Sequence, residues 1–258
     1  MANTIDHDAY ADRTAGEIDR MAWITDGVDP AAPVPTCPGW TMSKLLKHTG
    51  TVHRWVTEII TTQATERVDS RALNLRLPEK ESDYAGWLTD GAPGLANALR
   101  IAGPDMAMWA LGTEQTSGWW ARRMLHETTV HRADAELASH IEPVVDAVVA
   151  ADGIEEFLGN LPSRNLPSGN WPKRHLAELP AGKSLHLHGT DGDGEWLLRF
   201  TGTGIEWERG HAKATTAIRG PLTLLLLFVY GRVPASDERL TVFGDEELPA
   251  IWQEKTAL

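Results

Sequence analysis

The stretch MLHETTVHRADAEL, residues 124–137, decides how the first half of the chain is interpreted. Glu127 precedes His131 by four positions, and His126 lies next to the glutamate. Side chains four residues apart on a helix have Cβ atoms about 6 Å apart on one face, so Glu127 and His131 can reach a common ion. Such pairs also occur on many solvent-exposed helices. The pair is therefore a candidate for two metal ligands, and not yet a site.

A third ligand would have to come from a neighbouring element, because a mononuclear catalytic site usually combines three protein ligands with an open position. The segment GWTMSKLLKHTGTVHRWVTEII, residues 39–60, predicts a helix that carries His48 and His53. These two histidines are separated by roughly 140° around the helix, so one can face the interior while the other lies nearer the edge. His48 shares an apolar stripe with Leu45 and Val52 and is the preferred candidate.

Helical periodicity recurs in four segments of the first half, which predicts a bundle with short to moderate connections. The predicted helices cover residues 6–25, 41–60, 82–102 and 117–139. A further helix is predicted within 142–162, and the Pro- and Gly-rich segment 26–39 indicates a long ordered loop.

The second half of the chain differs from the first in composition and in the pattern of its apolar residues. Residues 164–183 are rich in Pro, Gly and basic residues and mark a domain junction. Alternation of polar and apolar residues then predicts strands and hairpins, with a buried helix after Gly220-Pro221 and a terminal helix at 245–254. We therefore expect two domains, a helical bundle over 1–160 and a small α+β domain over 161–258.

Composition excludes several classes of partner. The 258 residues carry a formal net charge of -12, which opposes non-specific binding to nucleic acid or to an anionic membrane. The longest apolar run, LTLLLLFVY at 222–230, is about half of the roughly 20 residues that a membrane-spanning helix needs. With one cysteine, Cys37, and no secretory signal, the expected location is the cytoplasm.

Two blocks of sequence carry a family resemblance: VPTCPGWTMSKLLKHTGTVHRW at 34–55 and WWARRMLHETTVHRADAELA at 119–138. In order and spacing they resemble the motifs of the mycothiol-dependent maleylpyruvate isomerase family, one of the DinB-like metal-binding bundles. Residues 185–200, 217–232 and 243–248 are similar to the family's second domain, which is related to the sterol carrier protein fold. The resemblance implies a DinB-like four-helix bundle followed by an α+β sterol-carrier-like domain.

The same resemblance implies a site and an activity. His48, Glu127 and His131 would hold a divalent metal, with zinc as the first choice and iron or nickel as alternatives. The metal would activate the thiol of mycothiol, and the thiolate would add to a small electrophile. Expulsion of the thiol after rotation would make the protein an isomerase, whereas a persistent adduct would make it an S-transferase. The electrophile, and whether the protein is a monomer or a homodimer, stay open.

Other residues are weaker candidates. Arg232 and Arg219 are the candidates for catalysis and for binding the sugar-inositol part of mycothiol, and Arg232 is preferred because it follows the buried helix. Trp109, Trp119 and Trp120 are candidates for lining the pocket. Surface salt bridges and core packing are the competing interpretations.

Residues beside the expected ligands have ordinary explanations too. Salt bridging on the helix accounts for at least two of Arg122, Arg123, Arg132 and Asp134, and one of them could orient a ligand. Cys37 is interpreted as a packed loop residue, and Trp40 as an anchor of the same loop.

Two other functions use the same residues. Two histidines and one carboxylate also form the facial triad of non-heme iron oxygenases. Alternatively, the chain could be a non-catalytic binder of metal or of an apolar ligand. Bound iron with oxygen-dependent turnover would favour the first, and a fully coordinated ion would favour the second.

Overall fold

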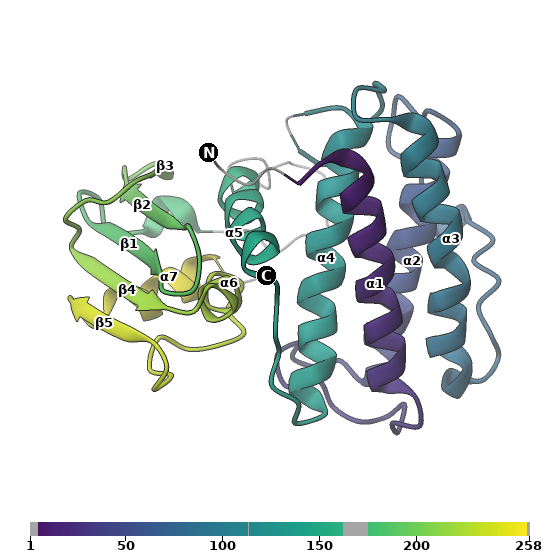
Figure 1. The fold of residues 1–258 in the computed structure, drawn as a ribbon, viewed down its shortest axis with the longest axis horizontal. Coiled ribbons are helices and arrows are strands. Elements are labelled where there is room, and N and C mark those ends of the chain that lie inside the picture. The colour runs from purple at the N-terminus through teal and green to yellow at the C-terminus, as the bar shows by residue number, and fades with distance from the viewer. Residues whose placement is uncertain (1–4, 113, 162–174, 257–258) are drawn as a thin grey trace. The chain divides into compact units, whose positions relative to one another are not determined.

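The chain divides into two compact units, Ile5–Pro143 and Val144–Leu258 (Figure 1). The computed structural model describes residues 5–112, 114–161 and 175–256. The division differs from the expected boundary after residue 160, because α5 (Ala147–Asn160) packs against α6 (Leu222–Val229) of the second unit. Most of the predicted junction at 164–183 lies outside the described residues.

The first unit is a bundle of four helices, as the sequence predicted: α1 His7–Thr25, α2 Met42–Thr61, α3 Tyr84–Ala102 and α4 Ser117–Ala138. Short 3-10 turns at Ser70–Ala72 (η1) and Glu81–Asp83 (η2) precede α3. Side chains of Asp6, Thr41 and Thr116 accept hydrogen bonds from the first turns of α1, α2 and α4, which explains where these helices begin. Helix α4 packs against both α1 and α2.

Helix α4 is buried around most of its circumference, although many of its side chains are polar. Its buried polar residues are Ser117, Arg123, His126, Thr128, Thr129, His131, Arg132, Asp134 and Glu136. Burying polar groups costs free energy unless they are hydrogen-bonded or paired. A surrounding core of apolar residues from α1, α2 and α3, among them Ile18, Met21, Leu45 and Leu88, supplies the offsetting burial.

The segment that leads into α2 is ordered by its own backbone. Pro33 and Thr41 form an antiparallel bridge, and the amide of Val34 donates to the carbonyl of Trp40. Gly39 has a φ of 80°, a left-handed conformation that favours glycine at this turn. This geometry holds Cys37 and Trp40 in fixed positions beside the bundle, as expected of a long ordered loop.

The second unit contains a five-stranded mixed sheet with strand order β3-β2-β1-β4-β5. The strands are β1 Ser184–Gly189, β2 Glu195–Phe200, β3 Ile205–Arg209, β4 Thr216–Gly220 and β5 Thr241–Gly244. Only β1 and β4 pair in parallel among these neighbours. The remaining elements are α5, α6, the 3-10 turn Leu176–Glu178 (η4) and α7 Leu248–Thr256. The predicted α+β domain is therefore confirmed.

The two faces of this sheet differ. Leu185, Leu187, Trp196 and Ile218 are fully buried on the face that α6 covers. Because successive side chains of a strand point to opposite faces, His186 and His188 lie on the other face. Among the described residues, no helix is long and apolar enough to cross a membrane, and the apolar helix α6 has only 8 residues.

Candidate metal centre

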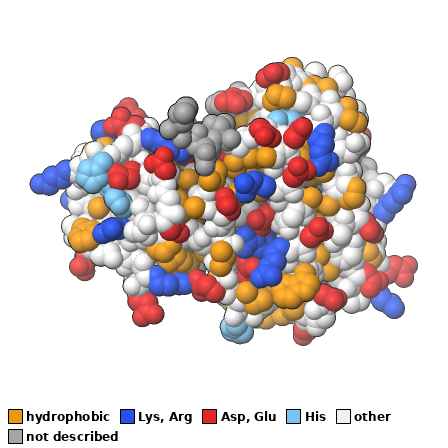
Figure 2. All heavy atoms as spheres, in the orientation of Figure 1, with side chains coloured by type: hydrophobic (Ala, Val, Ile, Leu, Met, Phe, Trp, Pro, Cys, Tyr) orange, Lys and Arg blue, Asp and Glu red, His pale blue; other side chains and the backbone are white. Residues whose placement is uncertain are grey.

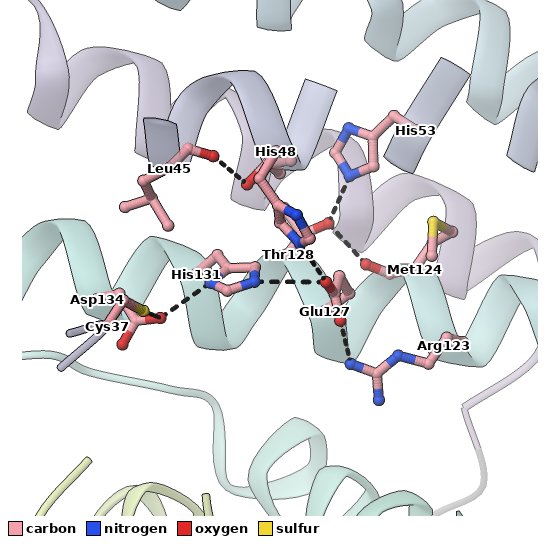
Figure 3. A network of polar contacts seen from close by, with 11 residues as sticks. Cys37, Leu45, His48, His53, Arg123, Met124, Glu127, Thr128, His131 and Asp134 are labelled. Atoms are coloured by element: carbon pink, nitrogen blue, oxygen red, sulfur yellow. Dashed lines mark hydrogen bonds and ion pairs between the residues drawn. The ribbon is translucent and has the colours of Figure 1, made fainter. Parts of the chain in front are cut away.

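His48, Glu127 and His131 meet between α2 and α4 (Figure 3). His48 Nε2 lies 3.0 Å from Glu127 Oε1, and His131 Nε2 lies 3.3 Å from the same oxygen. One donor atom from each residue lies within 4.8 Å of the others. Two imidazoles and a carboxylate at this spacing form a donor set that suits zinc or another divalent transition metal.

The carboxylate of Glu127 is held in its charged form. Burial alone would raise its pKa, but Arg123, one helical turn earlier, and hydrogen bonds from His131 and His48 together hold the pKa well below its ordinary value. Arg123 contacts Glu127 Oε2, whereas the histidines contact Oε1. One oxygen therefore has a fixed cation, and the other faces the two imidazoles.

His131 is oriented from its other side. Its Nδ1 donates to Asp134 Oδ2 over 2.9 Å, so Nε2 points toward Glu127 and His48. Burial lowers the pKa of His131, but its contacts with Asp134, Cys37 and Glu127 outweigh burial and hold the pKa well above the ordinary value. A carboxylate that accepts from the far nitrogen of a ligand histidine fixes both the tautomer and the ring orientation.

Asp134 also ties the ordered loop to α4. The Thr36 hydroxyl donates to Oδ1 over 2.6 Å, and the Cys37 thiol donates to Oδ2 over 3.3 Å. Cys37 is thus a packed loop residue, in agreement with its interpretation from sequence. The sequence did not reveal which charged residue on α4 would orient a ligand, because that depends on where the loop before α2 lies.

Cys37, His131 and Asp134 form a second group with metal-ligand spacing. All three are buried, and their polar atoms are already joined by hydrogen bonds. The triad with His48 differs, because the side chain of His48 is 35% exposed and the triad is open on that side. A catalytic metal site keeps a position open to a further molecule, so the triad is the better candidate.

Trp40 and His53 are aromatic neighbours of the triad. The Trp40 ring lies 4.9 Å from the His48 ring and 5.9 Å from the His131 ring, between centroids. His53 is fully buried, its Nε2 lies 2.9 Å from Thr128 Oγ1, and burial lowers its pKa to about 3. His53 is therefore neutral and turned toward Thr128, and the choice of His48 over His53 agrees with the geometry.

The tryptophans that were candidates for lining the pocket form an aromatic cluster with Trp55. Trp109 and Trp120 lie 5.6 and 5.5 Å from Trp55, and Trp119 packs on Trp120 at 4.8 Å between ring centroids. Trp55 follows His48 by seven positions and Trp120 precedes Glu127 by seven, so this cluster lies two helical turns, about 10 Å, from the triad. Trp120 is fully buried and packs in the core.

The two arginine candidates belong to the second unit. Arg219 is exposed on β4, in register with His188 of β1. Arg232 follows α6 and is partly buried, and its Nη1 donates to the carbonyl of Tyr230 over 2.8 Å. Their assignment to mycothiol stays a prediction.

Arg132 has a structural explanation. It contacts Glu17 of α1 at 2.6 Å and also pairs with Glu136, which in turn accepts from Arg20 at 3.1 Å. These pairs raise the pKa of Arg132 although burial opposes them. The network joins α1 to α4 and takes no part in the triad, as expected for ordinary salt bridging.

Comparisons with known proteins agree with the resemblance read from the sequence. The family model of the mycothiol maleylpyruvate isomerase N-terminal domain matches residues 12–136, and the model of the corresponding C-terminal domain matches residues 148–250. None of the curated proteins matches the chain.

Two solved structures share the fold. A crystal structure of the mycothiol-dependent maleylpyruvate isomerase has a TM-score of 0.58 with 13% identity, covering 92% of this chain and 91% of that chain. A histidine-to-alanine mutant of that isomerase has a TM-score of 0.59 with 12% identity and the same coverage of 92% and 91%. The two family models together span both units. The chain belongs to the mycothiol-dependent maleylpyruvate isomerase family.

Proposed function

We propose that this protein is a metal-dependent enzyme that uses mycothiol as a thiol cofactor and acts on a small electrophile. The observation that carries the proposal is the triad of His48, Glu127 and His131, whose donor atoms lie within 4.8 Å of one another. Membership of the family supports the thiol, and the donor set supports the metal. Zinc is the metal that we expect first.

The residues at the triad fit a divalent ion. Glu127 is ionised, and Asp134 holds the Nδ1 proton of His131, which leaves Nε2 as the ligand atom. Arg123 balances part of the charge of Glu127 from the side away from the imidazoles. A bound divalent ion would lower the pKa of a coordinated thiol, so that the thiolate forms near neutral pH.

The thiolate of mycothiol would then form a sulfur–carbon bond with an electron-poor alkene carbon. The π bond of the alkene would break as the sulfur–carbon bond forms, and its electron pair would move to the electron-withdrawing group. Isomerisation would follow if the former double bond, now single, rotates before the π bond re-forms and expels the thiolate, and conjugation would follow if a proton is added to the neighbouring carbon instead. Trp40 packs against both histidine rings and restricts their movement. We propose isomerisation as the first activity to test and S-transfer as the alternative.

The test is calorimetric titration of mycothiol into protein of assayed metal content, beside the same protein stripped with a chelator. We expect metal-dependent binding that is lost in His48→Asn. His140→Asn is the matched control, because His140 is exposed and has a φ of 57°, which asparagine tolerates. Equal metal content and equal thiol binding in both variants would refute the proposal.

Two histidines and one carboxylate also keep an iron oxygenase as the second candidate. Oxygen consumption by the iron-loaded protein, with no heat from mycothiol, would favour it. Metal that stays bound while mycothiol, oxygen and electrophile all leave the protein unchanged would instead favour a non-catalytic binder.

A further inference from the structure

A second cluster of histidines lies on the open face of the sheet. It consists of His186, His188, His211 and Glu195, and we call it the sheet cluster. The space-filling view shows histidine side chains beside acidic ones at the surface of this unit (Figure 2). No part of the function proposed above depends on these residues.

The topology of the sheet brings the four residues together. His186 and His188 alternate on β1, so both project from the same face. Glu195, the first residue of β2, is in register with His188. The amide of Gly210 donates to the carbonyl of Glu195 over 3.0 Å, which extends the β2–β3 ladder and leaves His211 next to the same face.

The distances are those of a compact donor set. Glu195 Oε1 lies 3.0 Å from His188 Nδ1, and Oε2 lies 2.8 Å from His211 Nδ1 and 3.4 Å from His186 Nε2. One nitrogen from each histidine lies within 4.8 Å of the others. Nitrogens bound tetrahedrally to one zinc ion are roughly 3.4 Å apart, so small side-chain rotations would bring the three onto a common ion.

An unsatisfied nitrogen points to a ligand that is missing from this set. His186 is 3% exposed, and its Nε2 makes no hydrogen bond to any described residue. The nearby Glu195 oxygen is within ion-pair distance but does not meet hydrogen-bond geometry. A buried polar atom without a partner costs free energy that a bound ion would recover.

We propose that the sheet cluster binds one divalent transition-metal ion of the Zn²⁺ class through three imidazoles and the carboxylate of Glu195. Four protein ligands complete a tetrahedral site and leave no position for a substrate. The ion is therefore structural or regulatory. It fastens β1 to the start of β2 and to the segment after β3.

The test uses the full chain with the triad disabled by Glu127→Gln, so that the triad does not contribute, and the variants described below assign the bound ion to the sheet cluster. After chelator treatment this protein is titrated with Zn²⁺ in competition with a chromophoric chelator. We expect one Zn²⁺ ion per chain and a higher unfolding temperature with the ion bound. Absence of Zn²⁺ binding by this folded protein would overturn the proposal.

Variants of the cluster assign the ion to its residues. His211→Gln on the same background should weaken Zn²⁺ binding by about 10–100-fold, and because His211 is exposed the change does not endanger folding. His175→Gln is the matched control, since His175 is an exposed histidine of the same unit that pairs with Glu178. Equal Zn²⁺ affinity in the two variants would contradict the assignment. Because every variant here carries Glu127→Gln, these results do not depend on whether the triad binds metal, and the two proposals can fail separately.

Discussion

The two units each gather histidine and glutamate into a small space, but they do so with different secondary structure. In the first unit, Glu127 and His131 lie one helical turn apart, and His48 comes from the neighbouring helix. In the second, His186 and His188 alternate along one strand. Both arrangements bring three candidate ligand atoms within 4.8 Å.

The difference lies in what surrounds the carboxylate. Glu127 has Arg123 as a permanent cation, and Asp134 orients His131 from outside. Among the described residues, the ion-pair partners of Glu195 are the three histidines alone. Where residues outside the donor set hold the ligands in place, the metal ion can keep a coordination position for a further molecule. Where the ligands contact only one another, they can occupy every coordination position of the ion. We therefore associate the helical site with chemistry and the sheet cluster with stability.

Removing the helical carboxylate should have the largest effect. Glu127→Gln takes away the charged ligand of the triad, so Zn²⁺ affinity there should fall by more than about 100-fold, with loss of thiol-dependent turnover. Metal content and turnover of the chelator-treated and reloaded protein measure this. Glu58→Gln, at an exposed position on α2, is the control and should change neither. Because the sheet cluster is expected to keep one Zn²⁺ ion, the test is the difference from the unchanged protein; equal metal content and equal turnover in the two would show that the triad is not the site.

Changing the residue that orients His131 should have the next largest effect. Asp134→Asn keeps the size of the side chain but weakens its hold on the Nδ1 proton, so Zn²⁺ affinity at the triad should fall by about 10–100-fold. Asp12→Asn, on the exposed surface of α1, serves as the control. If affinity is unchanged while the protein loses stability, Asp134 serves only to anchor the loop.

The carboxylate of the sheet cluster should matter less than that of the triad. Glu195→Gln leaves three imidazoles, so we expect Zn²⁺ affinity there to fall by about tenfold, at the low end of the range for ligand-shell changes. The competition titration on the Glu127→Gln background measures it, with Glu206→Gln on β3 as the control. If Zn²⁺ affinity falls as far as it does at the triad in Glu127→Gln, the two carboxylates contribute equally and the proposed difference between the two sites is wrong.

Proton release should be the smallest difference. Contacts with Asp134, Cys37 and Glu127 hold the pKa of His131 well above its ordinary value, so a proton competes with a metal ion for this imidazole more strongly than for an ordinary histidine, and metal binding should release protons. Affinity at the triad should therefore rise with pH until that raised pKa is passed. Burial lowers the pKa of His186, so the proton competes less with a metal ion at that imidazole. Calorimetry in buffers of different protonation enthalpy, on a variant that keeps only the triad, measures the protons released there; release of none would contradict this prediction.

Local patterns were enough to predict much of the first unit. The spacing of Glu127 and His131 follows directly from helix geometry, and the apolar stripe that contains Leu45 favoured His48 over His53. What the sequence did not reveal depends on tertiary structure. Asp134 gains its role because residues 36 and 37 fold back onto α4, and no periodicity encodes that contact.

The second unit shows the same limit. His186 and His188 are visible as alternating strand residues, but His211 joins them only through the register of two hairpins. The placement of α5 was missed for a similar reason. Its sequence indicates a helix with an apolar face, but not which of two cores that face will join.

The one-turn spacing on α4 also constrains how this protein can evolve. A single inserted residue between Glu127 and His131 would rotate the histidine by about 100° and carry it away from its partner. The same insertion would shift Asp134 relative to Glu127, because Glu127, His131 and Asp134 lie on one helix, and Asp134 could not keep its contacts with Thr36 and Cys37 while Glu127 kept its own. Residues 62–69, between α2 and η1, carry no such register. As this sequence evolves, we expect insertions and deletions to accumulate in residues 62–69. Helix α4 should keep its number of residues even where individual residues are substituted.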